Sequence, residues 1–219
     1  MKAGVLLSGS GVMDGSEIHE AVLTLLHLDK KGLDIICMAP DHNQTRIVNQ
    51  SSNEIIKTDT RNMLAESARI ARGDIKDISA IDSENIDMLI LPGGFGAAVN
   101  LCSFADEGPS CSVNPEVEKL INEMIDKNKP VGALCIAPAL IARIFGKRGI
   151  KVKLTIGNDP DTASAINKMG AEHIACPVNQ AVIDRKNRVV TAPAYMLAKS
   201  ITDVELSVKG MIDGIFELL

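Results

Sequence analysis

The chain has 219 residues and a formal net charge of −5, with no tryptophan, one tyrosine and four phenylalanines. This length suits one α/β domain whose large core is built from aliphatic side chains. The acidic charge, the lack of a lysine- or arginine-rich block and the few aromatic residues argue against a nucleic-acid-binding protein. No apolar stretch is long enough to predict a membrane span, so neither nucleic acid nor a membrane is an expected partner.

Five cysteines occur without a CxxC pair or a zinc pattern. We therefore predict no metal and no other cofactor. The apolar run that follows Lys2 is too short for a signal peptide. Free thiols are typical of a reducing compartment, and together these features predict a cytoplasmic location.

Apolar strands alternate with helical patterns, which is typical of a mostly parallel sheet covered by helices on both faces. The predicted strands cover residues 2–8, 34–39, 46–49, 54–58, 87–92, 131–134, 151–155, 174–176, 182–184 and 189–192. The predicted helices cover residues 16–31, 62–71, 114–128, 136–145, 161–170 and 196–219. The polar stretch 41–86 predicts a small insertion beside the main sheet, within a single domain of residues 1–219.

Three predicted strands end in groups that are suited to chemistry. They are followed by the glycine-rich loop Gly9–Gly15, by the turn Gly93–Gly96 and by Cys135. Because functional sites of such sheets lie at the carboxyl ends of the strands, we expect all three to face one crevice.

Cys135 follows the strand 131–134 directly, and a helical pattern begins at Ile136. This spacing predicts a sharp strand-to-helix turn with the cysteine at its tip, as in the nucleophile elbow of hydrolases. Free N–H groups and the positive end of the helix dipole would favour the thiolate, so Cys135 is the predicted nucleophile. The backbone N–H groups of Gly94 and Ile136 are the predicted oxyanion donors. The alternative is a cysteine that only packs in the core.

Glu17 and Glu20 lie three residues apart at the start of the first long helix, so they share one helix face. One of these carboxyls is predicted to reach Cys135 and to move protons to and from a substrate. The alternative is that both only complement the helix dipole. His19 is predicted to lie on the surface, and His173 is a candidate for a classical Cys-His pair.

The Gly9-x-Gly11-x-x-x-Gly15 loop also resembles a dinucleotide-binding fingerprint, with Asp41 where a ribose-binding acid would stand. The spacing of its glycines is one residue longer than the standard pattern, which makes a nucleotide site the minor alternative. Gly11 and Asn100, which follows the second glycine turn, are further candidate site residues.

Several stretches give the chain a family likeness, among them Leu91-Pro-Gly-Gly-Phe-Gly-Ala-Ala and Cys135-Ile-Ala-Pro-Ala. The others cover residues 9–26, 60–64, 154–157, 170–173 and 191–198. With them the chain resembles the ElbB-like family (enhancing lycopene biosynthesis proteins, or isoprenoid biosynthesis glyoxalases). This family belongs to the PfpI-type branch of the class I glutamine amidotransferase-like superfamily. The resemblance implies a flavodoxin-like three-layer αβα sandwich with a nucleophile elbow, usually as a homodimer.

The resemblance also implies that the elbow cysteine works with a glutamate of the first helix. Counting back from Gly32 makes Glu20 the first choice and Glu17 the second. The implied activity is that of a glyoxalase III-type lyase (hydro-lyase), which converts methylglyoxal or glyoxal to the hydroxy acid without glutathione. Cys135 would form a hemithioacetal with this small carbonyl substrate. Many members of the superfamily place a histidine near the elbow, whereas Ile136 follows Cys135 here and no triad histidine is evident.

Two other activities are weighed against this one. Glutamine amidotransferases carry Gly-x-Cys-x-Gly at the elbow and a later His-x-Glu, and neither occurs in this chain. Ammonia production from glutamine is therefore disfavoured. The remaining alternative is a non-catalytic regulator that senses oxidants or binds a small ligand through the same reactive cysteine.

Overall fold

The computed structural model describes all 219 residues and is organised around a seven-stranded sheet. The strands run β10-β11-β7-β6-β1-β2-β5 across the sheet, and every neighbouring pair is parallel except β10 with β11. Their bounds are β1 Lys2–Leu6, β2 Asp34–Ala39, β5 Lys76–Asp77, β6 Met88–Leu91, β7 Val131–Leu134, β10 Val182–Asp184 and β11 Val189–Ala192. The predicted mostly parallel sheet is confirmed.

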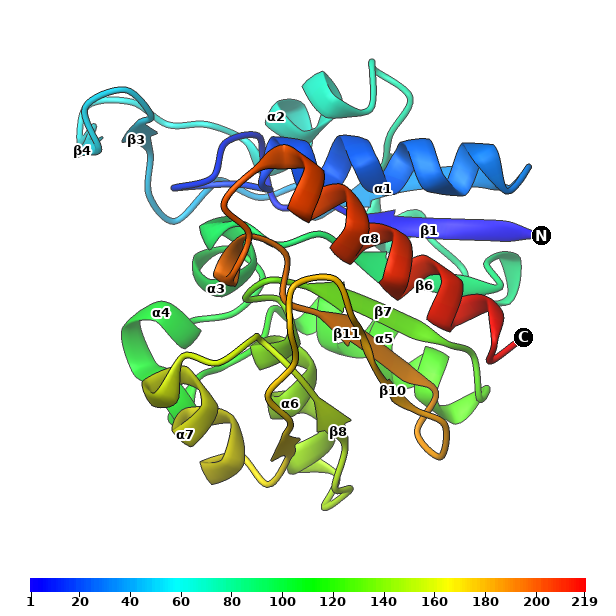
Figure 1. Cartoon of the computed structure of the whole chain (residues 1–219). Helices are drawn as coiled ribbons and strands as arrows, with labels where there is room; N and C mark the ends of the chain where they lie inside the picture. The colour runs from blue at the N-terminus through cyan, green and yellow to red at the C-terminus, as the bar shows by residue number, and fades with distance from the viewer.

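Helices cover both faces of this sheet (Figure 1). Their bounds are α1 Ile18–Lys30, α2 Met63–Ile70, α3 Phe95–Val99, α4 Phe104–Glu107, α5 Pro115–Asp126, α6 Pro138–Lys147, α7 Pro160–Lys168 and α8 Ile201–Phe216. Helices α1 and α8 pack together over one face, whereas α5 and α6 pack over the other. This is the three-layer, flavodoxin-like arrangement that the sequence predicts.

Strand β6 shows how one strand serves two cores. Leu89 and Leu91 belong to the apolar cluster that includes α5 and α6, whereas Met88 and Ile90 belong to the cluster with α1 and α8. Successive side chains of a strand point to opposite faces, so a run without polar residues is required where both faces are covered.

Two short strand pairs lie outside the main sheet. The antiparallel pair β3 (Val48–Asn49) and β4 (Glu54–Ile55) forms the predicted hairpin, which extends away from the body of the molecule in Figure 1. The parallel pair consists of β8 (Lys153–Leu154) and β9 (Glu172–His173). The strand predicted at 174–176 is therefore wrong, because the backbone pairs two residues earlier.

The last helix begins later than predicted. Residues Ala194–Met196 form a 3₁₀ turn, and α8 starts only at Ile201 after a capping box between Ser200 and Asp203. Ser200 accepts a hydrogen bond from the Asp203 N–H, and the Asp203 carboxylate accepts one from the Ser200 N–H. This reciprocal bonding fixes the helix start. The 3₁₀ turn therefore lies between the carboxyl end of β11 and the start of α8. None of the helices combines the length and the apolar composition needed to cross a membrane.

Candidate active site

Cys135 lies at the tip of a sharp turn between β7 and α6, as predicted. Its φ of +59° is in the left-handed region, which a residue with a side chain adopts at an energetic cost. The Cys135 N–H donates to the Ala192 carbonyl at 3.0 Å, so the backbone is still paired with β11 at this point. The chain then turns, and α6 begins at Pro138. The strand pairing on one side and the helix on the other hold the cysteine in this conformation.

Glu20, in the first turn of α1, is completely buried, and its carboxylate lies beside the Cys135 side chain. Its carboxylate also accepts the Gly93 N–H at 2.8 Å and the Tyr195 N–H at 3.2 Å. The closeness of these groups leaves no room for a side chain at Gly93, where a Cβ would lie 2.4 Å from the Cys135 Cβ. The structure therefore brings together Glu20, Cys135 and the glycine turn, three features that the sequence singles out.

Burial dominates the electrostatics of this pair. It raises the pKa of Glu20 to about 7, and the charge of Glu17 adds to the shift. Burial also raises the pKa of the Cys135 thiol, and an ionised Glu20 raises it further. The N–H groups of Gly94 and Ile136, the two predicted oxyanion donors, act in the opposite direction on the thiol pKa. The two groups therefore do not both carry a full negative charge at neutral pH.

The prediction of a low-pKa thiol at a helix N-terminus is wrong. Helix α6 begins three residues after Cys135, and Cys135 is only 8% exposed. Desolvation of the charged form therefore outweighs the two backbone donors.

Glu17 caps α1 and does not reach the thiol. Its side chain accepts the Glu20 N–H at 2.7 Å, so Glu17 caps the helix, which begins two residues later than the predicted start at residue 16. His19 is half-exposed, as predicted, and its Nδ1 lies 2.7 Å from the Tyr195 hydroxyl. Glu17 thus acts on Glu20 through its charge and its cap.

Tyr195 is a site residue that the sequence analysis misses. It follows β11, whose carboxyl end lies beside that of β7. Because functional sites of such sheets lie at the carboxyl ends of the strands, the position of Tyr195 just after a predicted strand could have identified it. Its backbone bonds to Glu20, and its ring lines the cavity in front of Cys135.

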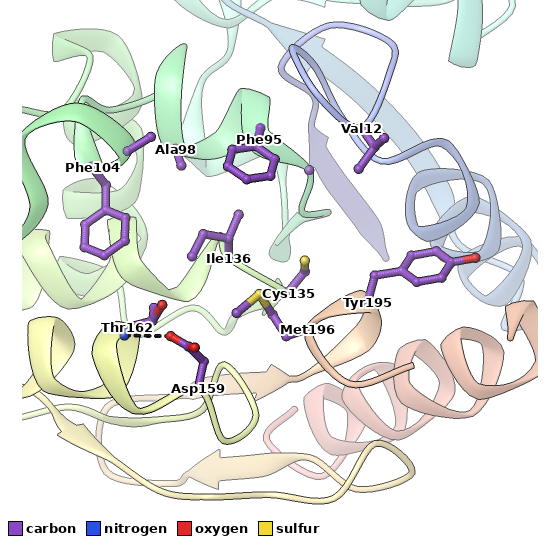
Figure 2. Close-up of a pocket in the computed structure, with 12 residues that line it drawn as sticks. Val12, Phe95, Ala98, Phe104, Cys135, Ile136, Asp159, Thr162, Tyr195 and Met196 are labelled. Carbon is purple, nitrogen blue, oxygen red and sulfur yellow. Dashed lines mark hydrogen bonds between the residues drawn. The ribbon is translucent and has the colours of Figure 1, made fainter. Parts of the chain in front are cut away.

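A cavity of about 420 Å³ opens in front of the Cys135 thiol. Figure 2 shows Phe95, Phe104 and Ile136 on one side of it and Tyr195 on the other. Nine of the twelve lining residues are apolar, and no histidine lies among them. The buried carboxyl of Glu20 lies beside the thiol, behind this apolar wall.

His173, the candidate partner for a Cys-His pair, does not line this cavity. It lies in β9, and its Nε2 faces the Ile156 N–H at 3.4 Å. The structure therefore does not unite His173 with Cys135, and the Cys-His interpretation is wrong.

Asn100 and Gly11 stabilise the loops around the site. The Asn100 amide donates to the carbonyls of Ser8 and Asp14 at 2.9 and 2.8 Å. The Gly11 N–H donates to the Ser16 carbonyl at 3.0 Å, and a Cβ at Gly11 would lie 2.8 Å from the Gln50 side chain. Neither residue lines the cavity, so both lie outside the first contacts of a bound substrate.

The glycine-rich loop does not form a phosphate cradle. The N–H groups of Gly9, Gly11 and Gly15 all bond within the protein. Asp41, the predicted ribose ligand, accepts a hydrogen bond from the Asn62 side chain at 2.6 Å. A dinucleotide needs free backbone donors at such a loop, so the nucleotide interpretation has no structural support.

An α/β sandwich with a cysteine elbow and a glutamate on the first helix defines a class, and comparison with known proteins agrees with it. No established family model matches the chain. The ES1 protein homolog of Rattus norvegicus is 39% identical over 226 aligned residues, with 99% of this chain and 84% of that protein covered. Glutamine amidotransferase-like class 1 domain-containing protein 3 of Homo sapiens is 40% identical, with 99% and 83% covered.

A solved structure agrees with these relatives. The isoprenoid biosynthesis protein with an amidotransferase-like domain from Ehrlichia chaffeensis has a TM-score of 0.93 and 39% identity, covering 100% of this chain and 99% of its own. Glyoxalase III from Candida albicans is more distant, with a TM-score of 0.63 and 19% identity, and shares the fold. The chain therefore belongs to the ElbB-like (ES1) family of class I glutamine amidotransferase-like proteins.

These relatives also correct the predicted location. The rat and human proteins, and the zebrafish ES1 protein at 31% identity, are all named as mitochondrial. The cytoplasmic location predicted from the sequence is contradicted by this finding. Free cysteines indicate a reducing environment, and that property does not distinguish one reducing compartment from another.

The raised pKa of Glu20 predicts how stability depends on pH. The folded state favours protonated Glu20, so between the ordinary pKa of 4.5 and about 7 it keeps a proton that the unfolded chain loses. The free energy of unfolding should therefore fall as the pH rises through this window, by roughly 3 kcal/mol from this group. Urea unfolding of the wild type and of Glu20→Gln across the window measures this slope.

Glu20→Gln should lose the slope, because it removes the ionisable group. The matched control is Glu54→Gln, which removes an exposed carboxylate on the β4 strand and should keep the slope. Parallel pH profiles for the wild type and Glu20→Gln would contradict the assignment.

Proposed function

We propose that this protein is a glutathione-independent, glyoxalase-like cysteine enzyme that converts 2-oxoaldehydes such as methylglyoxal to 2-hydroxy acids. The observation that carries the proposal is the buried Glu20 carboxyl, which backbone N–H groups of Gly93 and Tyr195 hold beside the Cys135 side chain. A carboxyl with a pKa near 7 beside a nucleophile is suited to moving protons in both directions at neutral pH. The fold shared with a protein named glyoxalase III supports the same class of reaction.

The first step forms a bond between sulfur and carbon. The Glu20 carboxylate takes the thiol proton while the Cys135 sulfur adds to the aldehyde carbon, C1. The C1 oxygen gains the negative charge, faces the N–H groups of Gly94 and Ile136, and then takes the proton from Glu20. Two backbone donors at a developing oxyanion are a common means of stabilising such an adduct. The product is a hemithioacetal.

The next steps move hydrogen from C1 to C2. Glu20, again a carboxylate, removes the C1 proton while the proton of the C1 hydroxyl passes to the C2 oxygen, which gives an enediolate. Glu20 then returns its proton to C2, and the C1 oxygen becomes the carbonyl of a 2-hydroxy thioester on Cys135. One water molecule then cleaves the thioester and restores the free thiol. The sum is 2-oxoaldehyde plus water to 2-hydroxy acid, without an external oxidant or reductant.

The second candidate function is a non-catalytic regulator that uses the same cysteine. The absence of a histidine from the cavity favours it, because the acid–base chemistry depends on one carboxyl. The raised thiol pKa disfavours rapid oxidation by peroxide, since the thiolate is the reactive form. This candidate predicts sulfenate at Cys135 without turnover of any oxoaldehyde.

Replacing the nucleophile tests the proposal. Cys135→Ser should reduce formation of lactate from methylglyoxal to the background rate, because a serine hydroxyl is far less nucleophilic at this pH. The matched control is Cys176→Ser, which removes another free, buried thiol that does not line the cavity and should keep the activity. Wild-type protein without turnover above background would overturn the proposal.

The pH profile tests which glutamate moves the protons. The ratio kcat/KM should rise with pH through about 7, because Glu20 must be ionised to act as the base. Glu20→Gln should lower kcat/KM by about 100-fold or more. Glu17→Gln should keep much of the activity and shift the rise to lower pH, because the Glu17 charge helps to raise the pKa of Glu20. The reverse ranking of the two variants would place Glu17 in the catalytic role.

We also propose that the protein acts as a homodimer. Ile18, Val22 and Leu26 lie on one face of α1 and are 44, 47 and 40% exposed. An apolar stripe of this kind marks an interaction surface. Val22→Asp should shift a dimer towards the monomer in sedimentation equilibrium, whereas Leu206→Asp, at an exposed apolar position of α8, should not. A wild-type protein that sediments as a monomer contradicts this part of the proposal.

A further inference from the structure

The cavity in front of Cys135 is much larger than methylglyoxal. Its volume is about 420 Å³. A group the size of a water molecule occupies about 30 Å³, so an oxoaldehyde with five non-hydrogen atoms would fill on the order of 150 Å³. More than half of the cavity would remain in contact with water when methylglyoxal is bound. A site of this size suits a ligand with about twice as many atoms.

The walls of the cavity are apolar, and some of the side chains that form them are exposed to water, which is unfavourable for an apolar group. Phe95 and Val12 are among the most exposed large apolar side chains of the molecule, at 47 and 41%, and both line this cavity. Phe104 and Ala98 continue the apolar wall away from the thiol (Figure 2). Exposed apolar side chains gathered around a nucleophile are typical of a binding surface for an apolar group.

The charges at the cavity exclude anionic substrates. Among the lining residues, Asp159 alone has a side chain that is charged at neutral pH, and no lysine, arginine or histidine lines the wall. Asp159 caps α7, where its carboxylate accepts the Thr162 N–H at 2.8 Å. The Thr162 hydroxyl and N–H lower the pKa of Asp159, so this group stays negative. Phosphorylated or carboxylated carbonyl compounds would meet a negative charge without a compensating cation.

We infer that the preferred substrates are neutral 2-oxoaldehydes that carry an apolar alkyl or aryl tail, an inference that rests on the proposed function. The aldehyde carbon would lie at the Cys135 sulfur, with its oxygen towards the N–H groups of Gly94 and Ile136. The tail would extend along Phe95 and Ala98 towards Phe104. The binding energy of the tail would hold the reacting carbon at the Cys135 sulfur. Methylglyoxal has no such tail and would gain none of this binding energy.

A chain-length series tests this inference through turnover. The wild-type kcat/KM should rise by about two- to fourfold for each added methylene, for straight-chain 2-oxoaldehydes of three to about eight carbons. Ala105→Phe and Ala98→Leu add bulk to the cavity wall from α4 and α3. In both variants the ratio of kcat/KM for the longest oxoaldehyde to that for methylglyoxal should fall towards one. Ala65→Phe adds the same bulk at an exposed position of α2 and should behave as the wild type.

A labelling experiment tests the apolar preference without turnover. N-alkyl iodoacetamides of increasing chain length modify Cys135, with the rate followed by intact mass and divided by the rate with glutathione. Cys135→Ser supplies the background from the other four thiols. The corrected rate should rise with alkyl length in the wild type and stay flat in Ala105→Phe.

Turnover and labelling together distinguish failure of the proposed function from failure of the inferred preference for apolar tails. Labelling that rises with alkyl length, without turnover of any oxoaldehyde, would overturn the proposed function and support the apolar cavity as a ligand site. Turnover that is equal for methylglyoxal and the longer oxoaldehydes, with flat labelling rates, would overturn the inference and leave the proposed function standing.

Discussion

The close approach of the buried Glu20 carboxyl to the Cys135 side chain is the contact on which the site depends. It forms only because α1 docks its first turn against the carboxyl ends of β6 and β7. Gly93 makes that approach possible, since a Cβ there would lie 2.4 Å from the Cys135 Cβ and 2.7 Å from the Glu20 Oε2. The elbow, the helix and the glycine turn are therefore one unit, and a shift in any of them separates the carboxyl from the sulfur.

The same contact lowers the stability of the fold, although the proposed chemistry requires it. Burial disfavours both the ionised carboxyl and the thiolate, and the left-handed backbone at Cys135 adds strain. Four backbone N–H groups oppose this cost, those of Gly93 and Tyr195 at the carboxyl and those of Gly94 and Ile136 at the sulfur. As a result, Glu20 loses its proton near pH 7. In the proposed reaction this group both accepts and returns a proton, and such a group works best near that pH.

Local spacing is enough to predict the elbow and the two backbone donors, because each depends on a strand or helix whose period is visible in the sequence. Spacing alone leaves Glu17 and Glu20 as alternatives, and only the family resemblance favours Glu20. Helix α1 begins two residues later than predicted, since its cap at Glu17 depends on a hydrogen bond whose geometry the sequence does not contain. Tyr195 bonds to a carboxyl 175 residues away. The thiol pKa depends on how deeply the fold buries Cys135, so a rule based on the helix N-terminus gives the wrong direction.

In the proposed reaction, the cavity would supply a preference for one substrate although the site contains no histidine. In the proposed reaction a single carboxyl carries every proton transfer, so the chemistry itself offers little discrimination among aldehydes. Discrimination must then come from the groups that surround the reacting carbon, and these are Phe95, Ile136 and their apolar neighbours. Apolar burial acts on the part of a substrate that does not react, and it positions the part that does. In the proposed reaction the wall of the cavity, more than the Glu20–Cys135 pair, would therefore determine which aldehyde is preferred.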